Sequence, residues 1–81
     1  MPEPPRIVRV EAVGSITRPG WQIPVRATLR FDDGSVRDVE AMATAWTRDA
    51  VEITWTVSGS ESSTDWIPSD DVRPARPRRR R

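Results

Sequence analysis

Alternation of apolar and polar side chains in the segment WQIPVRATLRF, residues 21–31, is the feature that most constrains the fold. Successive side chains of a β-strand point to opposite faces of the sheet, so a period of two predicts a strand with one buried face. That face holds Trp21, Ile23, Val25, Ala27, Leu29 and Phe31. Pro24 lies on the other face and has no N–H to donate, so we expect it at a sheet edge or a bulge.

The next segment predicts a hairpin with a three-residue loop. Residues 32–34, Asp-Asp-Gly, suit a type I turn in which Gly34 supplies the left-handed conformation. The loop sets three cross-strand pairs, Ala27 with Val39, Val25 with Ala41 and Arg26 with Glu40. A two-residue turn would set Leu29 against Asp38 and mix apolar with charged side chains on both faces, so we exclude it.

The same argument predicts a second hairpin with its loop at residues 47–49. The expected pairs are Ala45 with Val51, Ala43 with Ile53, Ala41 with Trp55 and Val39 with Val57. Small side chains then face large ones, as the close approach of strands in a small barrel requires. Trp55, like Trp21, shares its face with the core residues, so we expect both indoles to be buried.

Two more strands complete the predicted fold. Residues 7–14 form the first strand, and residues 64–68 form the last one after the polar loop GSESST. Ser69 then caps one turn of 3₁₀ helix that ends at Val72. We therefore predict an all-β fold, a five-stranded small barrel. Its boundaries are a disordered amino terminus at 1–6, the barrel at 7–72 and a disordered arginine-rich tail at 73–81.

Residues 66–72, WIPSDDV, resemble the WIPSNYV-like segment that ends Src-homology-3 domains, and the strand order is similar to that of a Src-homology-3 or Tudor small barrel. In the Src-homology-3 family the proline and tyrosine of this segment line a groove for proline-rich peptides. The resemblance implies such a groove at Pro68, whereas Asp71 stands at the position of the tyrosine. The likeness to Tudor domains implies an aromatic cage for methylated side chains, helped by Asp65 or Asp49.

An immunoglobulin-like sandwich is the alternative fold. Residues 20–39 also look like the early strands of bacterial immunoglobulin-like repeats. Such a sandwich has seven strands, for which the roughly 65 residues expected to be ordered leave too little chain. The small barrel is therefore the fold that we predict.

The absence of cysteine and histidine excludes whole classes of chemistry. The chain has no disulfide, no thiolate metal site and no imidazole base. Asp65, Asp70 and Asp71 offer oxygen ligands for a divalent cation, but capping and solubility explain them better. We therefore predict no enzyme, no metal, no cofactor and no small-molecule substrate. No stretch approaches the roughly 20 apolar residues of a membrane span, so we expect a soluble, cytoplasmic protein without a membrane partner.

Charge is divided unevenly along the chain. Residues 1–72 hold seven arginines and all twelve acidic residues, a net charge of −5, whereas residues 73–81 hold six arginines and no acid. The tail arginines are Arg73, Arg76, Arg78, Arg79, Arg80 and Arg81. Such an arm can neutralise the phosphates of DNA or RNA. Its other interpretations are a solubilising end and a segment that folds back on the acidic domain.

Two further tryptophans are expected on the outside. Trp46 and Trp66 fall opposite the core set, and Trp46 lies beside Met42, so we predict an aromatic patch of Trp46, Trp66 and Met42. Exposed indoles stack on nucleic-acid bases or bind arginine and apolar side chains. We therefore predict a non-catalytic module that associates with nucleic acid through its tail and this patch. The alternative is a protein or peptide adaptor that uses the tryptophan face or a sheet edge.

Overall fold

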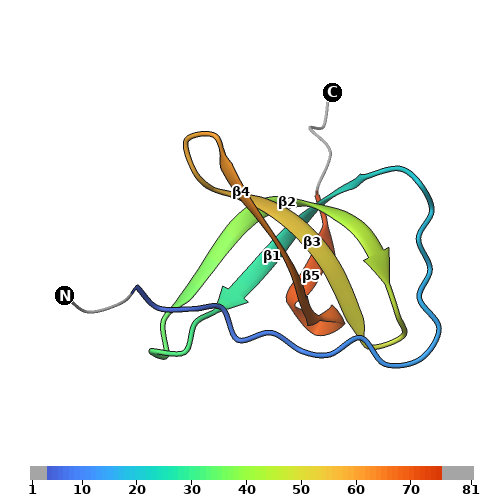
Figure 1. Cartoon of the computed structure of the whole chain (residues 1–81), viewed down its shortest axis with the longest axis horizontal. Helices are drawn as coiled ribbons and strands as arrows, with labels where there is room; N and C mark the ends of the chain where they lie inside the picture. Colours follow the sequence, from blue (N-terminus) through green and yellow to red (C-terminus); the bar gives the residue numbers. More distant parts are fainter. Residues whose placement is uncertain (1–3, 76–81) are drawn as a thin grey trace, which may run out of the picture.

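One antiparallel sheet organises residues 4–75, the part of the chain that the computed structural model describes (Figure 1). Its elements are β1 (Ile23–Arg30), β2 (Val36–Trp46), β3 (Ala50–Ser58), β4 (Glu61–Pro68), the 3₁₀ turn η1 (Ser69–Asp71) and β5 (Val72–Pro74). The five strands lie in the order β4-β3-β2-β1-β5. The predicted all-β class is confirmed. Among the described residues β4 and β5 are not paired with each other, so the sheet is not a closed barrel.

The hairpin of β1 and β2 has the predicted register. Ala27 pairs with Val39, Val25 with Ala41 and Arg26 with Glu40. The Phe31 N–H donates to the Ser35 carbonyl, and the Gly34 N–H donates to the Phe31 carbonyl, which closes the predicted loop of residues 32–34. Gly34 has a φ of +89°, a conformation that a side chain would disfavour. Turn chemistry and side-chain alternation therefore fix this hairpin together.

The hairpin of β2 and β3 differs from the prediction near its loop. Ala41 pairs with Trp55 and Ala43 with Ile53 as expected, but Ala45 pairs with Glu52 and Trp46 with Val51. A β-bulge between Ala43 and Ala45 shifts the register. The loop is also shorter, because the Thr47 N–H donates to the Ala50 carbonyl at 2.8 Å, and the Thr47 hydroxyl accepts from the Asp49 and Ala50 N–H groups. The bulge adds one residue to β2 and the loop is one residue shorter than predicted. The two changes cancel, so Ala43 and Ala41 keep their predicted partners.

The core lies on one face of the bent sheet. Its buried members are Val25, Ala27, Leu29, Ala41, Ala43, Ile53, Trp55 and Ile67. Trp55 is buried, at 6% exposure, as predicted. The prediction for Trp21 was wrong, because its side chain is 65% exposed. β1 begins only at Ile23, so the alternation of the strand does not extend back to Trp21.

Residues 7–14 do not form the predicted first strand. Instead, residues 4–22, here called the N-terminal segment, cross the open side of the sheet without forming a strand (Figure 1, blue). The Val8 N–H donates to the Arg30 carbonyl at the end of β1, and the Val10 N–H donates to the Trp66 carbonyl on β4. Thr17 then forms an isolated bridge with Trp46. The segment thereby links the end of β1 to the edge strand β4 and to the end of β2.

The fifth strand is β5, which pairs with β1 through Val72, Arg73 and Pro74. The ordered fold thus includes Arg73 and Pro74, which the sequence assigned to the tail. Ser69 is not the cap of η1, because Pro68 holds that position without a side-chain hydrogen bond. The turn is fixed instead by Asp71, whose two carboxylate oxygens accept from the Arg30 guanidinium at 3.0 and 3.1 Å.

The contact between β5 and the first hairpin predicts how stability depends on pH. The Thr28 hydroxyl donates to Asp38 at 2.8 Å, and the Arg73 guanidinium lies 3.5 Å from the same carboxylate. The Thr28 hydrogen bond, aided by the charges of Arg73 and Arg26, lowers the pKa of Asp38 below its ordinary value. A lowered pKa in the folded state stabilises the fold above the unfolded pKa of about 4, and this contribution is lost as the pH falls through the folded value.

We therefore expect Asp38→Asn to destabilise the protein near neutral pH and to have a smaller effect at about pH 3. The measurement is the urea midpoint of both proteins at several pH values, followed by circular dichroism. Thr28→Val, which keeps the carboxylate but removes its main donor, should give the same convergence at low pH. A difference between wild type and Asp38→Asn that stays constant with pH would contradict this account.

Candidate functional site

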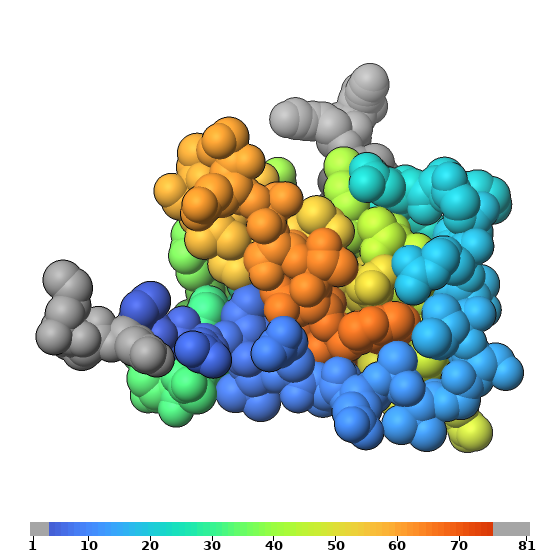
Figure 2. Space-filling view, viewed as in Figure 1, coloured from blue at the N-terminus to red at the C-terminus, as the bar shows by residue number. Residues whose placement is uncertain are grey.

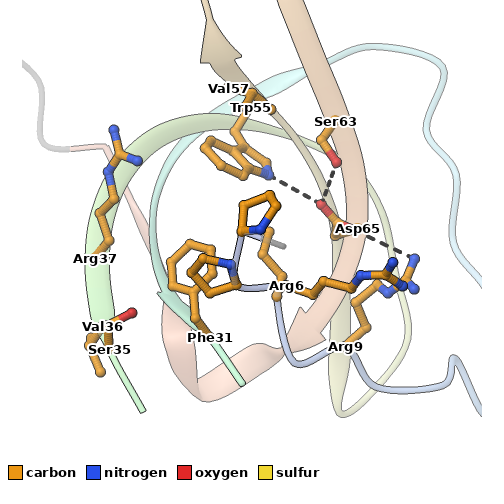
Figure 3. A pocket seen from close by; sticks show the side chains of 13 residues that line it. Arg6, Arg9, Phe31, Ser35, Val36, Arg37, Trp55, Val57, Ser63 and Asp65 are labelled. Atoms are coloured by element: carbon orange, nitrogen blue, oxygen red, sulfur yellow. Dashed lines mark hydrogen bonds and ion pairs between the residues drawn. The ribbon is translucent and has the colours of Figure 1, made fainter. Parts of the chain in front are cut away.

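A pocket of about 660 Å³ opens between the N-terminal segment, the β1–β2 hairpin and the β3–β4 hairpin. Its apolar lining comes from Phe31, Val36, Trp55 and Val57, with Pro4, Pro5 and Ile7 from the N-terminal segment. Figure 3 shows Trp55 and Phe31 around the opening, with Arg37 on one side and Arg6 and Arg9 on the other. The volume lies within the usual range for binding pockets, about 300–1,000 Å³.

The Trp55 indole at the pocket is hydrogen-bonded to Asp65. Its Nε1–H donates to Asp65 Oδ2 at 3.2 Å, and the Ser63 hydroxyl donates to the same oxygen at 2.8 Å (Figure 3). The other carboxylate oxygen of Asp65 lies 3.9 Å from the Arg9 guanidinium. Asp65 is buried, and burial of a charged carboxylate is unfavourable unless it has partners. The hydrogen bonds from Trp55 and Ser63 and the charge of Arg9 supply these partners. This carboxylate therefore orients the aromatic wall of the pocket.

Arg6, Arg9 and Arg37 lie at the rim, and among residues 4–75 the acidic residue of the lining is Asp65. Arg37 pairs with Leu29, so its side chain lies on the same face of the sheet as the core residues. Its side chain is nevertheless exposed, because this pair lies near the end of the hairpin. It makes no ion pair among residues 4–75. Among residues 4–75 the rim thus carries more basic than acidic side chains, although residues 1–72 as a whole are acidic.

Two valines give the pocket an open apolar surface. Val36 is 55% exposed and Val57 is 41% exposed, although both belong to strands. The β3–β4 register shifts between Thr56 and Ser58, which leaves Val57 out of the ladder. Sequence reasoning missed this pocket. The available signal was Arg37, a charged residue on the apolar face of β2, which indicates that the buried face ends before the hairpin does.

The predicted aromatic patch is not brought together on one face. Trp66 pairs with Glu52, whose carboxylate accepts from Arg18 and Thr44 outside the core. Trp46 instead pairs with Val51, because the bulge reverses its orientation relative to the strand. Both indoles are half-buried, as expected, whereas Met42 is exposed and lines a second pocket of about 390 Å³. None of the three lines the 660 Å³ pocket.

The remaining predicted site residues have structural partners or lie outside the described residues. Pro68 pairs with Ala50 at the end of β4, away from the pocket. Arg73 contacts Asp38 and donates to the Thr28 hydroxyl at 3.2 Å. Arg76, Arg78, Arg79, Arg80 and Arg81 lie outside the described residues.

The acidic residues considered as metal ligands are not gathered at one site. Asp65 contacts Trp55, and Asp71 contacts Arg30, so their carboxylates have separate structural partners. Residues 4–75 contain no group of three side chains arranged to hold a metal ion. Over the same residues, no helix has the length and apolar character that would let it cross a bilayer.

Removal of the Asp65 carboxylate should destabilise the fold and loosen the pocket wall. We expect Asp65→Ala to lower the free energy of unfolding by about 1–3 kcal/mol, because it leaves the buried Trp55 N–H without an acceptor. Asp65→Asn keeps an acceptor oxygen and should cost less. Urea unfolding followed by circular dichroism measures both effects. Equal stability of Asp65→Ala and wild type would contradict the structural role of this carboxylate.

The chain matches no protein-family model, no curated protein and no solved structure. The resemblance of WIPSDDV to the end of Src-homology-3 domains stays a proposal.

Proposed function

We propose that this protein is a non-catalytic binding module whose pocket accepts an apolar side chain from an acidic, extended segment of a partner protein. The observation that carries the proposal is the combination of exposed valines inside the pocket with the exposed Arg37 at its rim. Apolar contact would supply most of the affinity, and the Arg37 guanidinium would select for a carboxylate beside the apolar anchor.

The burial of the aromatic side chains favours a peptide over a stacked base at this pocket. Trp55 is only 6% exposed and Phe31 is half-buried, so their rings offer little open surface for stacking. Val36 and Val57 provide the accessible apolar surface instead. Aliphatic walls suit a leucine, valine or phenylalanine side chain, whereas sequence-tolerant nucleic-acid binding relies on open aromatic faces.

The test is selection of random peptides displayed on phage, with the full chain as bait. We expect enrichment of peptides that combine Asp or Glu with one or two large apolar residues. Arg37→Glu should weaken the selected peptides about tenfold, or about 1.4 kcal/mol, because it reverses a rim charge. Isothermal titration calorimetry measures this change.

Arg48→Glu is the matched control. Arg48 is exposed in the β2–β3 loop and does not line the pocket, yet the substitution changes the net charge equally. The control should bind like wild type. Peptides without acidic enrichment, or equal losses in the two variants, would contradict the proposal.

A second candidate function is nucleic-acid association through the tail. The observation that favours it is the concentration of six arginines and no acid in residues 73–81. Because Arg73 in β5 contacts Asp38 in β2, the arginines available to phosphates would be the five that follow Arg73 in the sequence. Each neutralised phosphate of duplex DNA contributes roughly 0.9 to the salt dependence of binding, so the slope should not exceed about 4–5.

Replacement of these five arginines by glutamine should abolish binding to labelled single-stranded and duplex oligonucleotides at low salt. The substitutions retain β5, and with it the contacts of Arg73. Fluorescence anisotropy of wild type and variant at low and moderate salt gives both affinity and slope. Equal binding of the two proteins, or no binding by wild type at low salt, would contradict a role for the tail.

We further propose that the bent sheet is an open relative of the Src-homology-3 type of barrel. The order of elements supports this assignment, since η1 joins β4 to β5 and β5 pairs with β1. The hydrogen bond from Val10 to Trp66 attaches the N-terminal segment to the free edge of β4. Pro68 does not line the pocket, so the proposed site is distinct from the proline-peptide groove that the resemblance implies.

A further inference from the structure

Around Val10, the N-terminal segment leaves one side of its backbone unpaired. The Val8 and Val10 N–H groups donate into the fold, and the Arg6 carbonyl accepts from Asp32. The groups that point into the fold belong to residues 6, 8 and 10, as in an extended chain, where successive residues point their backbone groups to opposite sides. The backbone groups of Arg9 therefore point away from the fold, and the same alternation, continued to Glu11, points its groups away as well. Neither residue makes a backbone hydrogen bond among residues 4–75. The chain therefore presents strand-like donors and acceptors to a partner.

The same stretch carries apolar side chains on the surface. Val8, Val10 and Val13 are all exposed, Val13 to 74%. Figure 2 shows this blue stretch lying across the front of the molecule, with nothing in front of it. β-branched residues in an exposed, unpaired extended chain favour the addition of another strand.

The charges around Val10 suit a second copy of this stretch. An antiparallel pairing centred on Val10 sets Arg9 opposite Glu11 of the other copy, and two-fold symmetry repeats the pair. Centring on Arg9 would place two arginines opposite each other, and centring on Glu11 would place two glutamates opposite each other. The charge pattern therefore selects one register.

Backbone direction and side-chain pairing agree with this register. The backbone groups of Arg9 and Glu11 face outward, so they can bond to those of the other copy. Arg9 opposite Glu11 is therefore a hydrogen-bonded pair of the antiparallel ladder. Val10 then meets Val10 of the other copy in a non-hydrogen-bonded pair, flanked by Val8 opposite Ala12. We propose that two copies of this chain form an antiparallel dimer through residues 7–13, with Val10 on the two-fold axis.

The dimer would place two copies of the 660 Å³ pocket in one assembly. Arg9 lines the pocket and would also face Glu11 of the second copy, so the two surfaces are neighbours. Arg37, the residue substituted in the test of peptide binding, lies on β2 and takes no part in the proposed pairing. Failure of peptide binding and failure of dimerisation are therefore separate results.

Cysteine cross-linking tests the register directly, because the chain contains no cysteine. In the proposed dimer the two Cα atoms at position 10 are about 4.5 Å apart, within the range for a disulfide. The two Cα atoms at position 13 are separated by six residues of strand, or about 20 Å. Val10→Cys should therefore form a disulfide-linked dimer under mild oxidation, and Val13→Cys should not.

The exposure of the two positions makes this comparison stringent. Val13 is 74% exposed and Val10 is 36% exposed, so random collisions would link Val13→Cys faster. Non-reducing electrophoresis and intact mass measure the products over time. Faster linkage of Val10→Cys supports the proposal. Equal or faster linkage of Val13→Cys, or no linkage of either variant, overturns it.

A charge exchange provides an independent measurement on the full chain. Arg9→Glu alone and Glu11→Arg alone each place like charges opposite each other in the symmetric dimer, so each variant should be monomeric. A mixture of the two variants restores both opposite-charge pairs and should double the mass measured by light scattering at low salt. Circular dichroism verifies that each variant is folded. A mixture that stays monomeric while wild type is dimeric overturns the register, and a monomeric wild type overturns the dimer.

Discussion

A sheet without a covering helix must bend over itself to bury one of its faces, and this constraint governs the whole structure. Residues 4–75 contain no α-helix, so strands alone bury the core. The alanines at positions 27, 41 and 43 let the strands come close to one another on the inner face, while Leu29, Ile53 and Ile67 fill the enclosed volume. Where the bent sheet fails to close, the N-terminal segment covers the opening, and the candidate pocket lies under its first residues.

Much of this sheet was predictable because residues close together in the sequence determine the pairing of its strands. The loop Asp-Asp-Gly and the alternation on either side of it determine the β1–β2 register without any tertiary contact. The β2–β3 register was predictable only in part. The hydroxyl of Thr47 shortens the loop by accepting from two N–H groups, and the bulge at Thr44 restores the pairing of Ala43 with Ile53. Because the shorter loop and the bulge cancel each other, the pattern of apolar and polar residues does not reveal either of them.

The remaining errors have tertiary causes. Residues 7–14 alternate like a strand, yet only isolated hydrogen bonds attach them, to β1 at one end and to β4 at the other. Trp21 continues the period of β1, but the strand begins two residues later and leaves the indole in solvent. The pocket combines side chains from three segments that are distant in sequence. Only Arg37, a charge on an otherwise apolar face, indicated from the sequence that this end of β2 is open.

The separation in sequence between contacting segments also bears on the order of folding. β1 to β4 are joined by short turns, so their three hairpins involve only local contacts. The hydrogen bond from Val10 to Trp66 and the ion pair of Arg30 with Asp71 instead close long stretches of chain. Closing such loops costs conformational entropy before any contact is gained. Residues 4–22 would therefore be among the last to reach their native positions, after the strands that they cover.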